Sequence, residues 1–554
     1  MEIFKKLTVV LLLFLVFSLP FFSARNFGPA FDEITHLPSG YSYLKTGEIN
    51  LNPQHPPLIK MIAALPLFFL DLKFDFDDPN LTGHEMNEWQ FGRNFLSSNG
   101  IDNLIFWGRL PIMLLSVLLG WYIFKWGREM FGYKAGFIGL FIYAFMPNII
   151  AHSQFITMDL GVAAFSFIAL YYLWKLTKDP SRKNIILSGL TLGLALGSKF
   201  SAVLLLPTSL FLIIVYIHKK HQRSSWQFKS LLSFKILLPI WILSFLVIWG
   251  LYLFPKDPLF YWQGVNTVYA DRNPDHFFYL NGNFNHDGWW YYFLWAFIIK
   301  TPVPFLIALG LSFFYRKNIK LNSLKSYFLF LPVFLFLAVT SWKGHNIGVR
   351  YILPVYPFLI LFVSGWISGI IWNNKDERSK QFEHSEAIDM EKSPVNSNGF
   401  KNGRSFRVWI LSFLFLILAG WYSYSTLSIY PDYLAYFNEL VGGSKNGYKY
   451  LDDSNIEWGH DLKRLAEYQD KNPESKVLLW ANSSVYQYYG VKNVVSLNDK
   501  NQWLNPEGEY VVSIHVVART KLLEQVYGDN SFNWAERYKP IGKIGQSFFI
   551  YKFP

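Results

Sequence analysis

The sequence predicts a polytopic α-helical membrane protein with about eleven transmembrane helices and a small α/β domain at its C-terminal end. Three observations predict this fold class. Hydrophobic residues make up 52% of the 554 residues and charged residues only 16%, against about 25% charged residues in an ordinary soluble protein. Apolar runs long enough to cross about 30 Å of hydrocarbon recur along the chain. After residue 429 the composition changes to that of a soluble domain.

The same composition excludes several classes of protein. An aromatic content of 19% rules out intrinsic disorder, a coiled coil and collagen. Because the chain has no Cys, it cannot form disulfides, use a thiolate in catalysis, or bind zinc or iron–sulfur clusters through cysteine. The net charge of +12 fits either nucleic-acid binding or an excess of Lys and Arg in cytoplasmic loops.

The predicted membrane spans follow from the apolar runs. They cover residues 5–22, 107–124, 133–151, 159–176, 184–199, 200–217, 232–254, 291–313, 326–342, 350–372 and 407–428. The division of 184–217 into two spans rests on Gly197-Ser198-Lys199, which interrupts the run. We expect the first span to be an uncleaved anchor rather than a cleaved signal peptide, because many further spans follow it.

The distribution of basic residues predicts the orientation. With these eleven spans, the basic loops all lie on the side of Lys5 and Lys6, and the positive-inside rule makes that side cytoplasmic. The loops concerned are 125–134, 175–183, 219–229, 316–325 and the flanks of 373–407. The net charge is therefore a topology signal, and we expect no nucleic-acid partner.

The chain divides into two predicted domains. Residues 1–428 form the transmembrane domain, with a long first outer loop at 23–106 and a polar, flexible cytoplasmic linker at 374–405. Residues 429–554 form the extracytoplasmic α/β domain. In this domain we predict a helix from Asp453-Ser454-Asn455 to Asn472-Pro473, and strands at 477–480, 510–514 and 548–551.

Candidate chemistry begins in the first outer loop. Asp32, Glu33 and His36 follow the first span closely. On a helix, Asp32 and His36 are four residues apart and share a face. Such a pair could form a general base with its orienting partner, or two ligands of a divalent metal. The spacing fits equally an acidic helix start, with Asp32 as its cap.

Further polar residues lie on the same predicted side. The prolines of Asn52-Pro53-Gln54-His55-Pro56-Pro57 stiffen the backbone around His55, which suits either a metal or phosphate contact or a plain helix entry. Asp159 opens the fourth span, where the helix dipole alone explains an acid. Lys300 falls about nine residues, or about 13 Å, into the eighth span. A buried ammonium there indicates a functional site unless the helix begins later.

Cations gather at the predicted outer ends of other spans. They are Lys199, Lys343, His345 and Arg350. Arg can grip a phosphate with two parallel hydrogen bonds, and Lys serves as a point charge. Each one alone fits an interfacial anchor, but carboxylates and cations from the whole chain meet on one rim.

Many of these residues belong to short motifs that follow one another along the chain. The chain resembles the polyprenyl-phosphate-sugar-dependent glycosyltransferases of family 39, which have the GT-C fold and include protein O-mannosyltransferases and aminoarabinose transferases. The motifs are Phe31-Asp32-Glu33, Asn52-Pro53-Gln54-His55-Pro56-Pro57-Leu58, Gly197-Ser198-Lys199-Phe200, Gly288-Trp289-Trp290-Tyr291-Tyr292-Phe293 with Lys300-Thr301-Pro302, Asn346-Ile347-Gly348-Val349-Arg350-Tyr351 and Asp453-Ser454-Asn455-Ile456-Glu457-Trp458-Gly459.

The resemblance implies an inverting transfer of a sugar from a polyprenyl-phosphate donor to a protein, lipid or glycan acceptor outside the membrane, in a bacterial inner membrane. It places the catalytic base at Asp32, with Glu33 beside it. The departing phosphate would be bound by Lys300, Lys199, Arg350 and His55, supported by Asp159, His345, Trp289 and Trp290. Trp289 and Trp290 also fit an interfacial aromatic belt.

Two questions stay open at this stage. Some relatives bind a divalent metal ion near the donor phosphate and others need none; Glu33, His36 and His55 are the candidate ligands here. The alternative function is a lipid or sugar transporter, or a flippase, without covalent chemistry. It predicts inverted repeats and helices broken at the membrane midplane, and the sequence shows neither.

Overall fold

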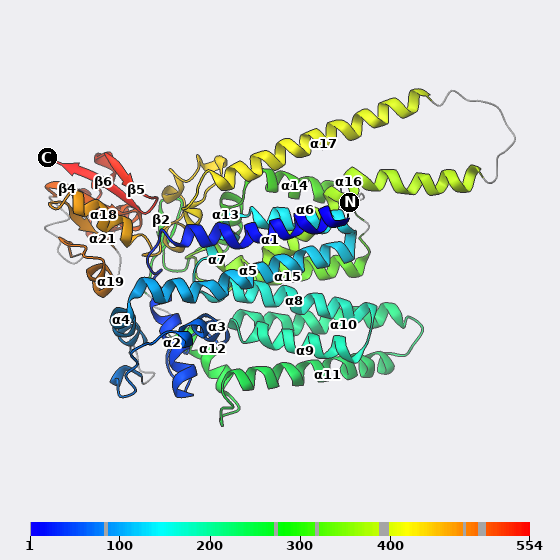
Figure 1. Cartoon of the computed structure of the whole chain (residues 1–554), viewed down its shortest axis with the longest axis horizontal. Coiled ribbons are helices and arrows are strands. Elements are labelled where there is room, and N and C mark those ends of the chain that lie inside the picture. Colours follow the sequence, from blue (N-terminus) through cyan, green and yellow to red (C-terminus); the bar gives the residue numbers. More distant parts are fainter. Residues whose placement is uncertain are drawn as a thin grey trace.

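The protein is a long helical bundle with a small α/β domain at one end (Figure 1). The computed structural model describes residues 2–81, 87–270, 275–315, 319, 321–386, 398–479, 483–496 and 506–554. The helices of the bundle are α1 (Glu2–Ala24), α5 (Ile101–Phe131), α6 (Tyr133–Ala144), α7 (Pro147–Ser153), α8 (Met158–Lys178), α9 (Arg182–Leu196), α10 (Leu205–Lys220), α11 (Trp226–Leu251), α13 (Tyr292–Lys300), α14 (Val303–Phe314), α15 (Ser323–Lys343), α16 (Val355–Glu386) and α17 (Asn398–Leu427).

Each of the eleven predicted spans corresponds to one of these helices or to a helix pair. Within the described residues, six helices are long and apolar enough to cross a membrane, or eight if each of two bent pairs counts as one span. The protein is therefore an integral membrane protein. The helices α9 and α10 are separate, as Gly197-Ser198-Lys199 predicts, and the short 3-10 helix η3 (Phe200–Leu204) lies between them.

Two predicted spans are bent: 133–151, where α6 and α7 meet at 65°, and 291–313, which bends more sharply. The segment 291–313 consists of α13 and α14, which meet at 116° around Thr301-Pro302. Pro302 has no amide hydrogen and disfavours a helical conformation at Thr301, so the helix ends at Lys300 and a new one begins. The residues between Tyr291 and Lys300 do form one helix, α13, so the depth of Lys300 in the membrane stays a prediction.

The loops predicted to lie outside gather at one end of the bundle. Helices α2 (Glu33–Thr46), α3 (Leu58–Ala64), α4 (Asn87–Asn99) and α12 (Phe260–Ala270) lie at the end that carries the α/β domain, and the N-terminus and the α10–α11 connection lie at the other (Figure 1). The two sets of loops are therefore separated in space as predicted. Which end faces the cytoplasm stays a prediction.

The predicted linker 374–405 is partly helical, which corrects the expectation of an unstructured connection. Helix α16 extends through residue 386 and α17 begins at residue 398, while 387–397 lie outside the described residues. The basic residues Arg316, Lys317 and Lys320 also lie outside them.

The C-terminal domain contains a four-stranded sheet in the order β3-β4-β6-β5. Its elements are α18 (Leu462–Lys471), β3 (Lys476–Leu478), α19 (Ser483–Tyr488), β4 (Gly508–Ser513), α21 (Ile514–Tyr527), α22 (Trp534–Arg537), β5 (Gly542–Ile544) and β6 (Phe548–Phe553). Strand β3 pairs parallel with β4, and β6 pairs antiparallel with both β4 and β5. A further hairpin, β1 (Phe278–Leu280) and β2 (Asn283–Asn285), belongs to the loop before α13.

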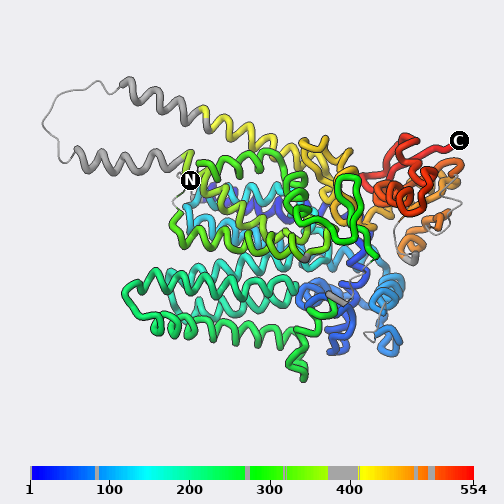
Figure 2. The backbone as a smooth tube through the Cα atoms, turned by 180° about the vertical axis from the view of Figure 1, so that it is seen from behind, coloured from blue at the N-terminus to red at the C-terminus, as the bar shows by residue number. Residues whose placement is uncertain are grey.

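All three predicted strands are present, although Trp480 lies outside the described residues. The predicted helix start at Asp453 is wrong, since α18 begins only at Leu462. Asp453 and Gly459 have φ angles of 56° and 76°, in the left-handed region that helices exclude. Residues 453–460 instead form an irregular segment, here called the connector, which packs against the end of the bundle. Figure 2 shows from behind that the domain lies against this end.

Candidate active site

Asp32 is the residue before the first turn of α2, but its side chain does not cap the helix. Its Oδ2 accepts a hydrogen bond from Nη1 of Arg350 at 2.6 Å. The backbone around Asp32 is held by the connector, because Phe31 N donates to the Trp458 carbonyl and Gly28 N to the His460 carbonyl, both at 2.8 Å. The carboxylate is thus fixed in place and remains 21% exposed.

Asp32 belongs to a cluster of four alternating charges, here called the charge cluster. Arg350 Nη1 lies 3.8 Å from Asp159 Oδ2, and Asp159 Oδ1 accepts a hydrogen bond from Lys199 Nζ at 2.5 Å. Burial lowers the pKa of Arg350, but the carboxylates of Asp32 and Asp159 outweigh it and raise this pKa above the ordinary value. The structure thus brings together four of the predicted residues, with Lys199 and Asp32 at opposite ends of the cluster.

Aromatic rings cover the two cations of the cluster. The Arg350 guanidinium lies 4.3 Å from the ring centre of Trp458, and Lys199 Nζ lies 4.4 Å from that of Tyr351. Such contacts stabilise a cation without neutralising it. Among the described residues, the buried Nε of Arg350 has no hydrogen-bond partner. A donor therefore remains on this guanidinium for an anion.

Glu33 has a different environment from Asp32. It is fully buried, and its carboxylate accepts hydrogen bonds from Arg109 Nε and Nη2 at 2.9 and 2.6 Å, and from the backbone N of Ala30 and Ile156 at 2.7 and 2.9 Å. Every acceptor direction of the carboxylate is used. This geometry favours a structural role for Glu33 rather than the predicted catalytic one.

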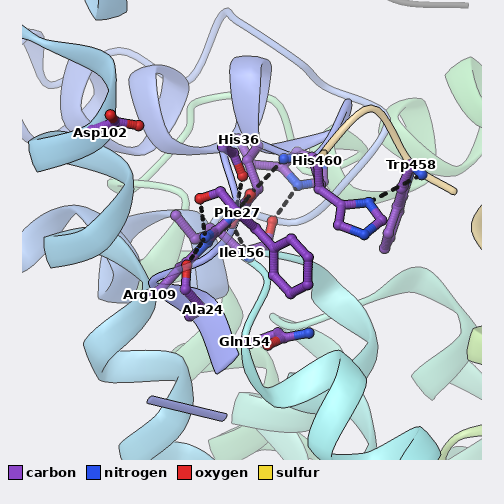
Figure 3. A network of polar contacts seen from close by, with 12 residues as sticks. Ala24, Phe27, His36, Asp102, Arg109, Gln154, Ile156, Trp458 and His460 are labelled. Atoms are coloured by element: carbon purple, nitrogen blue, oxygen red, sulfur yellow. Dashed lines mark hydrogen bonds and ion pairs between the residues drawn. The ribbon is translucent and has the colours of Figure 1, made fainter. Parts of the chain in front are cut away.

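Arg109 completes this network, which Figure 3 shows from close by. Besides Glu33, its guanidinium donates to the carbonyls of Ala24, Phe27 and Gly28 at 3.2, 3.4 and 2.7 Å. The end of α1, the start of α2 and the turn before α8 are thereby joined beside Asp32. Arg109 was not among the predicted site residues, although an arginine inside an apolar span indicates a functional or structural site.

The two histidines of the outer loop lie edge to face, with ring centres 5.4 Å apart. Within the described part of the chain, His36 Nδ1 lies 2.8 Å from the Ile156 carbonyl oxygen, and no hydrogen bond joins the imidazole ring to the Asp32 carboxylate. Burial lowers the pKa of His36, and burial together with His36 and Lys199 lowers that of His55 well below its usual range. Both rings are therefore neutral at pH 7, and His55 lies near the charge cluster.

The candidate metal ligands do not converge. The described residues contain no group of three or more His, Asp or Glu side chains arranged to hold a metal ion. Glu33 is occupied by Arg109, and His36 by a backbone carbonyl. The arrangement of these residues therefore does not fit a divalent metal ion.

Lys300 is buried, but it does not join the charge cluster. Its Nζ donates to the carbonyls of Leu434 and Asn455, each at 2.6 Å, and lies 4.5 Å from the ring centre of Phe437. Lys300 thus holds the backbone of the connector at Asn455 and the backbone of the preceding segment at Leu434. Its predicted contact with the donor phosphate is not supported by this arrangement.

The connector links the C-terminal domain to the rest of the site. Asn455 accepts a hydrogen bond from Val349 N at 3.0 Å and donates to Tyr292 OH at 2.9 Å. The buried carboxylate of Glu457 accepts hydrogen bonds from Gly459 N at 2.9 Å and from the Ser513 hydroxyl at 2.7 Å. Sequence analysis noticed this motif but did not predict that Trp458 would contact Arg350.

The remaining predicted residues lie beside the site. Asn346 accepts a hydrogen bond from Trp289 N at 2.5 Å, Trp290 is exposed, and the ring of His345 lies 6.0 Å from that of Phe278. The side chain of Lys343 lies outside the described residues. These groups lie near the C-terminal end of α15 and do not belong to the charge cluster.

Comparison with known proteins agrees with this architecture. Residues 101–249 match the family model described as dolichyl-phosphate-mannose-protein mannosyltransferase. The crystal structure of ArnT from Cupriavidus metallidurans bound to undecaprenyl phosphate covers 99% of both chains, with a TM-score of 0.50 and 12% sequence identity. The chain has the GT-C glycosyltransferase fold. Both findings confirm the resemblance to the family 39 transferases.

Two further structures are similar to this GT-C chain over part of their length. An oligosaccharyltransferase from Archaeoglobus fulgidus is 13% identical and matches 97% of this chain and 72% of its own, with a TM-score of 0.48. The protein O-mannosyltransferase complex Pmt1-Pmt2 of S. cerevisiae, bound to its sugar donor, is 18% identical and matches 50% of this chain and 36% of its own, with a TM-score of 0.34. No curated protein sequence matches the chain.

Proposed function

We propose that this protein transfers a sugar from a polyprenyl-phosphate donor to an acceptor hydroxyl, with inversion, at the end of the bundle that carries the C-terminal domain. The observation that carries the proposal is the charge cluster, in which a partly exposed carboxylate and two cations meet at one end of a membrane bundle. The GT-C fold and the matched mannosyltransferase segment support it.

Asp32 acts as the general base. Its carboxylate takes the proton of the acceptor hydroxyl while that oxygen attacks the anomeric carbon. The bond from the anomeric carbon to the phosphate oxygen breaks at the same time, and the oxygen leaves with the electron pair. Because the reaction is a single displacement, the configuration at the anomeric carbon inverts.

Lys199 and Arg350 stabilise the departing polyprenyl phosphate. Lys199 pairs with Asp159, whereas Asp32 pairs with Arg350, so a phosphate bound at Lys199 does not displace the partner of the base. Arg350 lies between the two carboxylates and keeps an unpartnered N–H. Asp159 spaces the two cations, and cations aimed at developing charge stabilise the transition state. The neutral ring of His55 can hydrogen-bond the phosphate or the sugar.

The location follows from the same reasoning. The charge cluster lies at the end opposite the basic loops, so the positive-inside rule places it outside the cytoplasm. We infer that the chain resides in a bacterial inner membrane, with its N-terminus in the cytoplasm and its C-terminal domain outside. The acceptor is a protein, lipid or glycan reached from that side.

The test uses the purified full-length chain in liposomes, supplied with polyprenyl-phosphate sugars and extracted membrane glycans, lipids and peptides. Released polyprenyl phosphate is measured. Asp32→Asn should lower kcat at least about 100-fold, because loss of a general base costs about 10²–10⁴. Lys199→Ala should mainly raise the KM for the donor. Asp102, which pairs with Lys463 at 2.8 Å on the same side, supplies the control Asp102→Asn.

The control variant should retain wild-type kinetics, since Asp102 lies outside the charge cluster. If Asp32→Asn transfers sugar as fast as the wild type, Asp32 is not the base. If the wild type moves the donor across the bilayer but releases no polyprenyl phosphate with any acceptor, the chain is a transporter and the proposal is wrong.

A further inference from the structure

A cavity lies at the outer end of α15. It has a volume of about 350 Å³, which is within the range of small-molecule sites. Its lining comes from the turn before α13, the last turns of α15 and the loop after α15. The lining residues are Asp287, Trp289, Trp290, Ala338, Ser341, Trp342, Gly344 and Asn346. The mechanism above uses none of them.

Aromatic rings form much of the wall. Trp290 and Trp342 are 69% and 79% exposed, and Trp289 lies deeper beside them. Tryptophans at the ends of membrane spans commonly anchor a protein at the lipid interface. Here, however, three of them surround a hollow that also contains polar groups. An aromatic face beside hydrogen-bonding groups suits a ligand that has both an apolar and a polar surface.

The polar groups are available for such a ligand. Among the described residues, the Asp287 carboxylate and the Ser341 hydroxyl have no hydrogen-bond or ion-pair partner. The buried amide nitrogen of Asn346 makes only a long bond of 3.4 Å, to the Gly344 carbonyl. A carboxylate, a hydroxyl and an amide donor can bind neighbouring hydroxyl groups. The negative charge of Asp287 disfavours the donor phosphate as the occupant.

The cavity is rigid on its inner side. Asn346 Oδ1 accepts a hydrogen bond from Trp289 N at 2.5 Å. Gly288 has a φ of 68°, and a Cβ there would lie 2.4 Å from this same oxygen, so only glycine permits the contact. Asn346 is therefore positioned before a ligand arrives, which lowers the entropic cost of binding.

The inner wall of the cavity is connected to Arg350 through the chain segment 346–350. Asn346 belongs to the loop that carries Arg350, and the connector fixes that loop through two hydrogen bonds. Ser454 donates to the Ile347 carbonyl at 2.8 Å, and Val349 N donates to Asn455 at 3.0 Å. A molecule bound in the cavity is therefore held at a defined place relative to Arg350.

We propose that this cavity binds a pyranose saccharide that forms part of the acceptor. The apolar face of a pyranose ring packs on Trp290 or Trp342, and its hydroxyl groups bond Asp287, Ser341 and Asn346. The assignment to the acceptor rests on the proposed transfer reaction, whereas binding of the saccharide does not. The saccharide belongs either to a free glycan or to a glycolipid of the outer leaflet, and both present the same ring chemistry.

Binding is tested on the full-length chain in nanodiscs by saturation-transfer NMR. The probes are the methyl pyranosides of glucose, galactose and mannose, and nanodiscs that contain or lack a monoglucosyl diacylglycerol. Trp290→Ala and Asp287→Asn should each weaken binding about tenfold or more, as expected for anchoring residues of a site. The matched control is Trp262→Ala, since Trp262 is 61% exposed but lies on α12, away from the cavity.

The outcomes separate the two sources and the two proposals. Binding of a methyl pyranoside indicates a free glycan, and a glycolipid that alone binds indicates a lipid-linked acceptor. If neither binds, or if Trp262→Ala weakens binding as much as Trp290→Ala, the saccharide site is wrong. Asp32→Asn should keep saccharide binding and lose transfer. Retained transfer in that variant would refute the role of Asp32 as general base, but it would not contradict the saccharide site.

Discussion

Replacing Glu33 by Gln gives the sharpest test of the distinction between the two neighbouring acids of the first outer loop. Glu33 and Arg109 are 0% and 1% exposed, and the carboxylate accepts four hydrogen bonds. Gln has the same shape but no charge, so the buried Arg109 guanidinium loses its counterion. Removing one partner of a buried ion pair costs about 3–5 kcal/mol.

This cost translates into a measurable change of the thermal midpoint. At about 2 cal/mol/K per residue, the entropy of unfolding of the whole chain is about 1.2 kcal/mol/K, so the expected shift is at least about 3 °C. We expect Glu33→Gln to lower the midpoint in detergent by this amount, and Asp32→Asn to leave it within about 1 °C. A Glu33→Gln protein that is as stable as the wild type, yet inactive per folded molecule, would refute the structural role and restore Glu33 to catalysis.

Three further predictions concern the connector and its contacts. Burial raises the pKa of Glu457 to about 7. Between about pH 4.5 and 7 the unfolded chain therefore binds fewer protons than the folded chain, so stability falls as the pH rises. Glu457→Gln should reduce this fall when the thermal midpoint is measured as a function of pH. Trp458→Ala should lower kcat about tenfold because the Arg350 guanidinium loses its ring contact, whereas Trp458→Phe should retain most of it; equal kinetics in both variants would contradict this role. Lys300→Met leaves the buried carbonyls of Leu434 and Asn455 without a donor, so it should lower the thermal midpoint and leave the donor KM of the folded enzyme unchanged; a raised KM alone would return Lys300 to the phosphate.

Sequence predicted the helices of this protein well because hydrocarbon imposes a length on every span. The same reasoning could not predict the turn of 116° at Thr301-Pro302, because proline occurs inside several continuous helices of this bundle, such as α5 and α11. Whether a proline kinks or ends a helix depends on what receives the freed backbone groups, and that information is tertiary.

The candidate site was predictable in part for the same reason. The predicted first outer loop indicated Asp32, and charge at the predicted outer ends of spans indicated Asp159, Lys199 and Arg350; these four do meet. Lys300 is a lysine in a predicted span, like Lys199. Its partners, however, are backbone carbonyls more than a hundred residues away in the chain. Spacing along the chain does not reveal such partners.

The contact between Trp458 and Arg350 has a consequence for biosynthesis. Both the ring over the guanidinium and the backbone bond that anchors Phe31 come from the connector, which the ribosome makes after every bundle helix, and the Glu457–Ser513 bond requires still later residues. A partly made chain already inserted in the bilayer holds its acids and cations without this support. Truncation just after α17 should therefore yield a bundle that is inserted but inert, and the proposed sugar transfer should begin only once synthesis of the chain is complete.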